Sequence, residues 1–383
     1  METSQGLATI ERIYQDRGRR ARELKSEGRN VVGYLCSLTP VELITAAGLV
    51  PFRIMANVKQ TITHADAYLE TIACPFTRSC LNMGLEGAYD FLDGFVVPHA
   101  CDNIVKLYDI WPHYIKHDYV HFVNAPHTLS EPSLRLFEAE LGTFRKSLER
   151  YTGGEISMER IREAIERHNE QRALVRRLYR LRQQDPPLVT GPEVTKIVVA
   201  TMSLPVVEAN DLLQQVISEI EQRRNVGDKK AARVMICGTG NDDTSFIQMV
   251  EESGASVVMD DLCFGSRSYS YQVDATDNPL AGIASSYLRK INCPRTYRES
   301  PGSHQEDLEN RFGYLYEYVK DFGVNGVILY LLMYCDTHEL DAPDVREYLQ
   351  GKGIPVLEIE GDYPTPSLGR LKTRVQAFLE MVR

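Results

Sequence analysis

Two stretches of this chain alternate short apolar segments with helical ones, and this alternation constrains the fold more than any other feature. The first runs VVGYLCSLTPVELITAAGLVPFRIM from residue 31 and leads on to FLDGFVVPHA. The second begins with ARVMICGTGNDD at residue 232 and continues through ASVVMDD, VNGVILYLLMY and IPVLEIE. Strands that alternate with helices along a chain pair in parallel. We therefore predict an α/β fold with two Rossmann-like parallel-sheet domains.

The remaining sequence is helical in character and divides the chain into four sections. At roughly 100–200 residues per domain, 383 residues suffice for two or three domains. Residues 130–225 are strongly charged with helical periodicity, interrupted by Pro186, Pro187 and Pro192. We expect an N-terminal helical segment at 1–29, a first α/β domain at 30–129, a helical connecting section at 130–229 and a second α/β domain at 230–383.

Charge and hydropathy exclude several classes of partner. The chain has 43 basic and 53 acidic residues, a net charge of -10, whereas a general nucleic-acid binder needs a clustered basic face. The N-terminal stretch METSQGLATIERIYQDRGRRARELKSEGRN lacks the apolar core of a signal peptide. No apolar run approaches the roughly 18 residues of a membrane span. We expect a cytoplasmic protein that binds neither nucleic acid nor a membrane.

The eight cysteines are the residues most suggestive of chemistry. Disulfides are uncommon in the cytoplasm, which leaves metal binding or simple burial. Cys101 follows the expected strand GFVVPHA and Cys335 follows GVILYLLMY, each directly before an aspartate. Ligands bind beyond the carboxyl ends of strands in open parallel sheets. Cys74 precedes a helix that begins with Pro75, where the helix dipole favours a metal-binding thiolate. Position alone leaves both burial and metal binding open.

The other cysteines are open to simpler interpretations. Cys80 lies six residues beyond Cys74, which fits no zinc-finger spacing. Cys36 and Cys237 lie in apolar strand contexts and are expected in the core. A structural zinc site is an alternative to a catalytic one, with His99 as a possible fourth ligand. The turn GTGND after the strand at 233–237 lacks the full glycine pattern of a phosphate loop, so no nucleotide is assigned to it.

Six stretches spread almost end to end resemble the 2-hydroxyacyl-CoA dehydratase and benzoyl-CoA reductase family of iron–sulfur subunits. Its motif of Cys, three residues and Arg-Ser falls on Cys74, Arg78 and Ser79. Its Cys-Asp falls on Cys101 and its C-terminal cysteine on Cys335. The matching stretches are PVELITAAGLVP, CPFTRSCLNMGLEG, FLDGFVVPHACDNIVKL, EESGASVVMDDLCFGSR, MYCDTHELDAPDVREYLQGKGIPVLEIEGDY and LGRLKTRVQAFLEM.

The resemblance implies a cofactor and a set of ligands. Cys74, Cys101 and Cys335 would hold one [4Fe-4S] cluster in a cleft between the two α/β domains, with Cys80 as a neighbour. Cys263 is the best alternative ligand, and Cys293 is the next. A [4Fe-4S] cluster normally has four thiolate ligands, so three would leave one iron able to act as a Lewis acid.

The resemblance also implies a reaction and partners. A separate ATP-hydrolysing iron–sulfur activator supplies a low-potential electron, an acyl-CoA thioester is reduced to a ketyl radical, and water is eliminated. The chain would pair with a homologous second subunit as a heterodimer, or with a second copy of itself. Alternatives are a benzoyl-CoA reductase-type subunit and a double-cubane-type ATP-dependent reductase, whose larger cluster requires extra cysteines.

Three further residues are weak candidates for catalytic roles. Ser37 and Glu42 lie in the first strand-to-helix turn, where Glu42 is expected to support the helix start rather than to act in acid–base chemistry. Arg78 could pair with an anion or neutralise a reduced cluster, or it could be an ordinary helix-surface arginine.

Overall fold

Two four-stranded parallel sheets form the framework of the molecule. The computed structural model describes residues 4–223, 232–240, 242–363 and 368–382. The strand orders are β2-β1-β3-β4 and β6-β5-β7-β8, and every strand pair is parallel. The strands are β1 Val31–Tyr34, β2 Val50–Arg53, β3 Gly94–Pro98, β4 Tyr119–Val123, β5 Ala232–Gly238, β6 Ala255–Asp261, β7 Gly326–Leu332 and β8 Val356–Gly361. The predicted α/β fold with two Rossmann-like domains is confirmed.

The first sheet is covered by helices on both faces, because successive residues of a strand point to opposite sides. Val31 of β1 belongs to a core shared with α2, α4 and α5, whereas Val32 belongs to a core shared with α3 and α6. Strands buried on both faces read as continuous apolar runs. The helices are α2 Arg19–Ser26, α3 Val41–Ala46, α4 Pro75–Leu85, α5 Asp102–Tyr114 and α6 Glu131–Thr152, with the 3-10 turn η1 at Ala65–Ala67.

The second sheet has the same construction. Ile236 of β5 packs with α10 and α14, whereas the neighbouring Met235 packs with α8, α12 and α13. The helices are α8 Gly191–Thr201, α10 Ser245–Glu252, α12 His304–Asp321, α13 Asp336–Gly351 and α14 Leu368–Met381. Buried residues of the two domains meet in one continuous core, which includes Trp111 of the first domain and Phe378 of the second.

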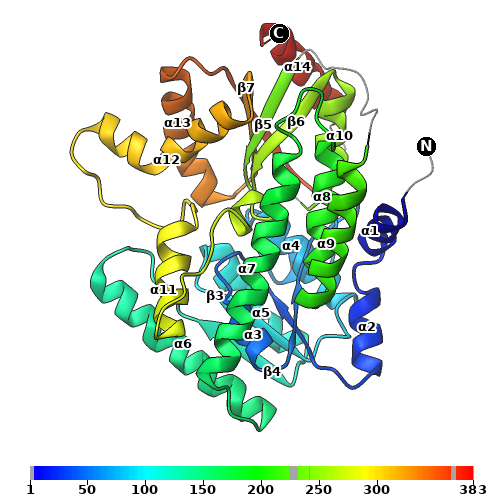
Figure 1. Cartoon of the computed structure of the whole chain (residues 1–383), viewed down its shortest axis with the longest axis vertical. Coiled ribbons are helices and arrows are strands. Elements are labelled where there is room, and N and C mark those ends of the chain that lie inside the picture. The colour runs from blue at the N-terminus through cyan, green and yellow to red at the C-terminus, as the bar shows by residue number, and fades with distance from the viewer. Residues whose placement is uncertain (1–3, 224–231, 241, 364–367, 383) are drawn as a thin grey trace.

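The long helices between the sheets connect the two domains (Figure 1). Helix α7 packs against α3 of the first domain and against α9. Helix α1 packs on α8 and α9, whereas α2 packs on β1, so the first 29 residues do not form one helix. The bounds are α1 Gln5–Gln15, α7 Met158–Arg180 and α9 Val206–Glu221.

One segment of the second half of the chain packs on the first domain. Helix α11, Pro279–Lys290, lies between β6 and β7 in the sequence but packs against α6. Its Leu280 and Ile283 share a core with Val32 and Val96 of the first sheet. The four-section division proposed from the sequence remains a prediction, and this segment crosses its last boundary.

Two smaller expectations can be placed in the structure. Among the described residues, no helix combines the length and apolarity that crossing a bilayer requires. In the GTGND turn, Asn241 lies outside the described residues, whereas Gly238 ends β5 with a φ of 129°. A side chain at that glycine would place a Cβ 2.2 Å from the carbonyl oxygen of Tyr330, so only glycine fits there.

Candidate metal centre

Three cysteines stand at the first turns of three different helices. Cys74 is the N-cap of α4, Cys101 that of α5 and Cys335 that of α13. Cys101 follows β3 of the first sheet, and Cys335 follows β7 of the second. Each central strand lies where the order of its sheet reverses, which is where ligands bind in such folds. The positive ends of three helix dipoles are therefore placed beside three thiols.

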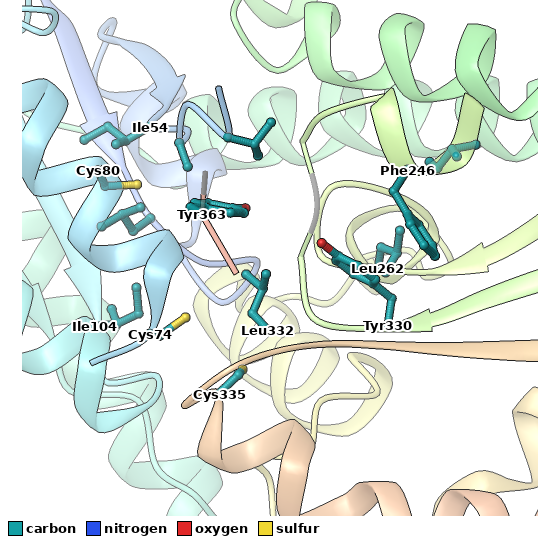
Figure 2. Close-up of a cluster of buried hydrophobic side chains, with 14 of the residues drawn as sticks. Ile54, Cys74, Cys80, Ile104, Phe246, Leu262, Tyr330, Leu332, Cys335 and Tyr363 are labelled. Atoms are coloured by element: carbon teal, nitrogen blue, oxygen red, sulfur yellow. The ribbon is translucent and has the colours of Figure 1, made fainter. Parts of the chain in front are cut away.

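The thiols of Cys74 and Cys335 interact directly. Figure 2 shows the two side chains pointing toward one another from different domains. A hydrogen bond from Cys74 lowers the pKa of the Cys335 thiol to about 7, despite its burial. The same hydrogen bond, followed by burial, raises the pKa of Cys74 well above its ordinary value. Cys335 therefore carries much thiolate at neutral pH while Cys74 keeps its proton.

Cys101 is the third member of this group. Burial raises its pKa to about 12, and the nearby Cys335 contributes in the same direction. Cys101 also raises the pKa of Cys74. Each of the three thiols thus affects at least one of the others, and negative charge on one makes ionisation of the next harder. A bound cation would remove that repulsion.

Asn103 ties together the segments that carry the three cysteines. It lies two residues after Cys101 in α5 and is 7% exposed. Its Oδ1 accepts a hydrogen bond from the backbone N–H of Cys74 at 3.2 Å. Its Nδ2 donates to the backbone carbonyl of Tyr334, directly before Cys335, at 3.2 Å. One amide side chain therefore links the two domains at the candidate site.

Strained backbone adjoins the cysteines in both domains. Within the described part of the chain, Cys36 and Tyr334 are the non-glycine residues with positive φ, at 66° and 62°. Such conformations are uncommon and cluster where the surrounding structure fixes them for function. Tyr334 is held because its N–H donates to Oε1 of Glu339 at 2.9 Å. The strain lets the chain turn sharply after β7 and present Cys335.

A second group of three cysteines lies beside the first. The pKa of Cys36 is raised by burial and then by Cys263, and the pKa of Cys293 is raised by burial and then by Cys263. Cys36 also affects the pKa of Cys101, which connects the two groups. Nη1 of Arg267 donates to the sulfur of Cys263 at 3.3 Å. Six of the eight cysteines therefore gather where the two sheets present their carboxyl ends.

A comparison with known families agrees with this arrangement. The family model of the 2-hydroxyglutaryl-CoA dehydratase D-component matches residues 36–382, a range that spans both cysteine groups. The chain belongs to this family. This confirms the resemblance noted in the sequence.

Named relatives of this D-component family chain cover it almost completely. A benzoyl-CoA reductase component from Thauera aromatica is 26% identical over 395 residues, covering 100% of this chain and 99% of that protein. The (R)-2-hydroxyglutaryl-CoA dehydratase subunit beta of Acidaminococcus fermentans is 26% identical over 370 residues, covering 93% of each chain. The putative dehydratase subunit YjiM of Escherichia coli (strain K12) is 28% identical over 370 residues, covering 94% of this chain and 93% of that protein.

The weak catalytic candidates of this D-component family member have structural partners. Glu42 is fully buried and pairs with Arg172 at 2.6 Å, while the Tyr287 hydroxyl donates to it at 2.7 Å. Burial alone would raise the pKa of Glu42, but Arg172 and His168 outweigh it and the pKa is lowered. Glu42 thus joins α3 to α7 and α11, which supports the structural interpretation; its catalytic role remains a prediction.

Arg78 and Ser37 have different surroundings. Arg78 forms an ion pair with Asp66 of η1 at 2.6 Å, so the family's Arg-Ser pair fixes α4 against the preceding loop. Ser37 hydrogen-bonds Ser268 at 2.7 Å and donates to the carbonyl oxygen of Cys263 at 3.4 Å. Ser37 therefore belongs to the surroundings of the second cysteine group rather than the first.

The remaining cysteines separate into core and site. Cys80 is fully buried in α4, and Figure 2 shows its sulfur pointing away from Cys74. Cys237 is buried in β5, as expected for a core residue. For Cys36 the expectation of a core strand residue is wrong, because it lies beyond the end of β1 and is only partly buried. Its position after an apolar strand, like that of Cys101, was the signal that could have identified it.

The zinc alternative gains no support from the geometry. Across the described residues, no three His, Cys, Asp or Glu side chains are arranged to hold a single metal ion. His99 hydrogen-bonds Asn124 at 3.2 Å and packs against the ring of His127. A cluster makes a different demand, since each cysteine binds a different iron atom and the thiols need not converge on one point.

Proposed function

We propose that this chain is the iron–sulfur subunit of an enzyme that activates an acyl-CoA with a low-potential electron. Cys74, Cys101 and Cys335 would hold a [4Fe-4S] cluster. The observation that carries the proposal is the meeting of these three thiols at three helix starts, within a chain of the D-component family.

The donor set fits such a cluster. Fe–S clusters are held by cysteine thiolates, and the helix dipoles together with the Cys74–Cys335 hydrogen bond favour thiolate at this site. Asn103 would keep the cysteines of both domains in register. When bound, the cluster would supply one-electron transfer and, at an iron without a cysteine ligand, Lewis acidity.

Dehydration of a 2-hydroxyacyl-CoA is the first candidate reaction. It is supported by the family model and by the (R)-2-hydroxyglutaryl-CoA dehydratase relative. In this reaction the substrate thioester is reduced to a ketyl radical, which expels the hydroxyl group as water. The chain would act with a homologous second subunit, or a second copy, and receive its electron from a separate ATP-hydrolysing activator.

An ATP-dependent reductase of the double-cubane type is the second candidate. Its larger cluster requires more cysteines than one [4Fe-4S] unit, and the group of Cys36, Cys263 and Cys293 supplies three of them. The effect of Cys36 on Cys101 places the two groups side by side. This observation favours two linked iron–sulfur units in one chain.

The iron and sulfide content of anaerobically purified protein distinguishes the candidates. We expect about four of each per chain for a single [4Fe-4S] cluster and about eight for a double cubane. Replacing Cys74, Cys101 or Cys335 by Ala should abolish the first unit under either candidate. Cys263→Ala should leave the iron content unchanged under the first candidate and lower it under the second.

Cys80→Ala is the matched control, because it removes a buried thiol from the same helix as Cys74. Its expected cost is about 1 kcal/mol of stability without loss of iron. Loss of iron in Cys80→Ala together with its retention in Cys74→Ala would show that the wrong cysteine has been assigned. Wild-type protein that binds no iron under anaerobic conditions would overturn the proposal.

A further inference from the structure

A cavity of about 360 Å³ lies at the carboxyl ends of the second sheet. Its walls come from the ends of β5 and β6, from α12 and α13, and from residues 292–298 after α11. In the strand order β6-β5-β7-β8, this is the point between β5 and β7 where the order reverses. Small molecules bind preferentially at such points, in pockets of about 300–1,000 Å³. The position and size therefore suit a small ligand.

A fixed turn brings one wall of the cavity into place. The N–H of Thr296 donates to the carbonyl oxygen of Cys293 at 3.0 Å, which closes a turn with Pro294 at its second position. Arg295 anchors the turn to the first domain, because its Nη1 and Nη2 donate to the carbonyl oxygens of Pro126 and Ala125 at 2.8 and 2.9 Å. The turn is therefore held rigidly before any ligand arrives.

The arginines that line the cavity fall into two classes. Arg267 pairs with Asp261 at 2.7 Å, and Arg311 pairs with Asp341 at 2.6 Å. Arg295 and Arg298 have no such carboxylate among the described residues. The negative groups that act on Arg295 are the thiols of three cysteines, and those that act on Arg298 are Tyr314 and Cys293. The cavity therefore carries two cations that carboxylates do not neutralise, in a protein of net charge -10.

Hydrogen-bond donors in the same wall also lack acceptors. Arg295 and Thr296 are each 6% exposed, yet Nε of Arg295 and the hydroxyl of Thr296 have no partner in the part of the chain that the structure describes. Nε of Arg267, which also lines the cavity, is in the same state. A buried charged donor without an acceptor is costly, and an anion in the cavity would satisfy all of these groups together.

We propose that this cavity is an oxyanion-binding site, in which Arg295, Arg298 and Thr296 hold a carboxylate or phosphate group beside the second cysteine group. The cavity admits a small molecule whole or the anionic end of a larger one. Two sources share this chemistry: a small free anion, or a phosphate of coenzyme A. The inference goes beyond the proposed function, and anion binding here does not require iron.

Calorimetric titration of the full-length, anaerobically purified protein with inorganic phosphate at constant ionic strength tests the proposal. We expect saturable binding that weakens by roughly tenfold or more in Arg298→Met and Thr296→Val, since hydrogen bonds to charged groups have about this strength. Arg298→Lys should restore part of the affinity because it keeps the charge. Arg346→Met is the matched control: this arginine pairs with Glu358 on the surface and lies outside the cavity, so affinity should not change.

A competition arm identifies the source of the anion. If coenzyme A displaces phosphate and its own binding weakens in Arg298→Met, the site holds a phosphate of the coenzyme. If phosphate binds but coenzyme A does not compete, the natural ligand is a small free anion. The proposal is overturned if neither probe binds saturably, or if both bind Arg298→Met and Thr296→Val as tightly as wild type. Iron content, measured on the same samples, reports separately on the proposed function.

Discussion

Replacing Asn103 by leucine should damage the candidate metal centre more than any other single change outside the cysteines. The substitution removes both hydrogen bonds of the amide, to the N–H of Cys74 and the carbonyl oxygen of Tyr334. Each buried backbone group left without a partner costs about 1–3 kcal/mol. The expected loss is therefore about 2–6 kcal/mol, concentrated where the two domains meet. Because the cysteine-bearing segments are then no longer linked, anaerobically purified Asn103→Leu should also lose most of its iron.

A second buried asparagine provides the matched control. Oδ1 of Asn82, in α4, accepts hydrogen bonds from the backbone N–H groups of Thr63 and His64 at 3.0 and 2.8 Å. Asn82→Leu should therefore lower stability by a similar amount through a loop that holds no cysteine. Urea unfolding followed by circular dichroism gives the stability of both variants, and iron analysis separates their effects on the metal centre.

An intermediate variant sharpens the comparison. Asn103→Asp keeps an acceptor for the Cys74 N–H but replaces the donor to Tyr334 by a carboxylate oxygen, so it should lose iron to an intermediate extent. Equal iron retention in Asn103→Leu and Asn82→Leu, at equal stability, would refute the reasoning. The asparagine would then stabilise the fold without positioning the cysteines.

Three further predictions concern the framework around the site. Glu42→Gln should cost about 3–5 kcal/mol of unfolding free energy because it leaves a buried arginine unpaired, whereas Glu221→Gln, in an exposed pair of the same 2.6 Å length, should cost about 1 kcal/mol or less; thermal unfolding with a urea series measures both. Burial lowers the pKa of His168 from 6.5 to about 4, so the unfolded state binds the proton first and stability should fall between about pH 6.5 and 4, by up to about 1.4 kcal/mol per pH unit; His168→Gln should remove this part of the pH dependence, and an unchanged profile would contradict it. Gly238→Ala should cost at least about 1–3 kcal/mol because of its positive φ and the contact with the Tyr330 carbonyl, and wild-type stability in that variant would show that the turn relaxes.

The strands and the cysteines at their ends were predictable because both are local properties of the sequence. Apolar runs of about four to seven residues followed by a polar turn indicate buried parallel strands, and the structure places β1, β3 and β7 on such runs. Once the sheets are parallel, the carboxyl ends of their strands share one edge. Cys101 and Cys335 follow from that geometry, and Cys36 would have followed from the same rule applied evenly.

Other parts of the site depend on contacts between residues far apart in the sequence. Asn103 carries no local signal, since its role arises only when Tyr334, 231 positions away, comes beside it. The packing of α11 on α6 likewise reflects the core of the first domain rather than any pattern within α11. The apolar periodicity of that helix indicates that one face is buried but cannot indicate against which domain.

The division of the cysteines between the domains explains why the linkage of the two sheets matters. The first group takes Cys74 and Cys101 from the first domain and Cys335 from the second. The second group takes Cys36 from the first domain, whereas Cys263 and Cys293 come from the part of the chain after β6. Neither sheet alone holds a complete group, so any ligand bound by either group also binds the two halves of the molecule to one another.

Ligand binding and domain docking would therefore be thermodynamically linked. A metal centre that forms only in the docked state stabilises that state by its own binding free energy, and the Asn103 hydrogen bonds act in the same direction without the metal. The anion cavity has the same construction, since its turn is anchored to the carbonyl oxygens of Ala125 and Pro126 while its opposite wall is α12 and α13. Binding at any of these three places should consequently strengthen the others, because each holds the same pair of domains together.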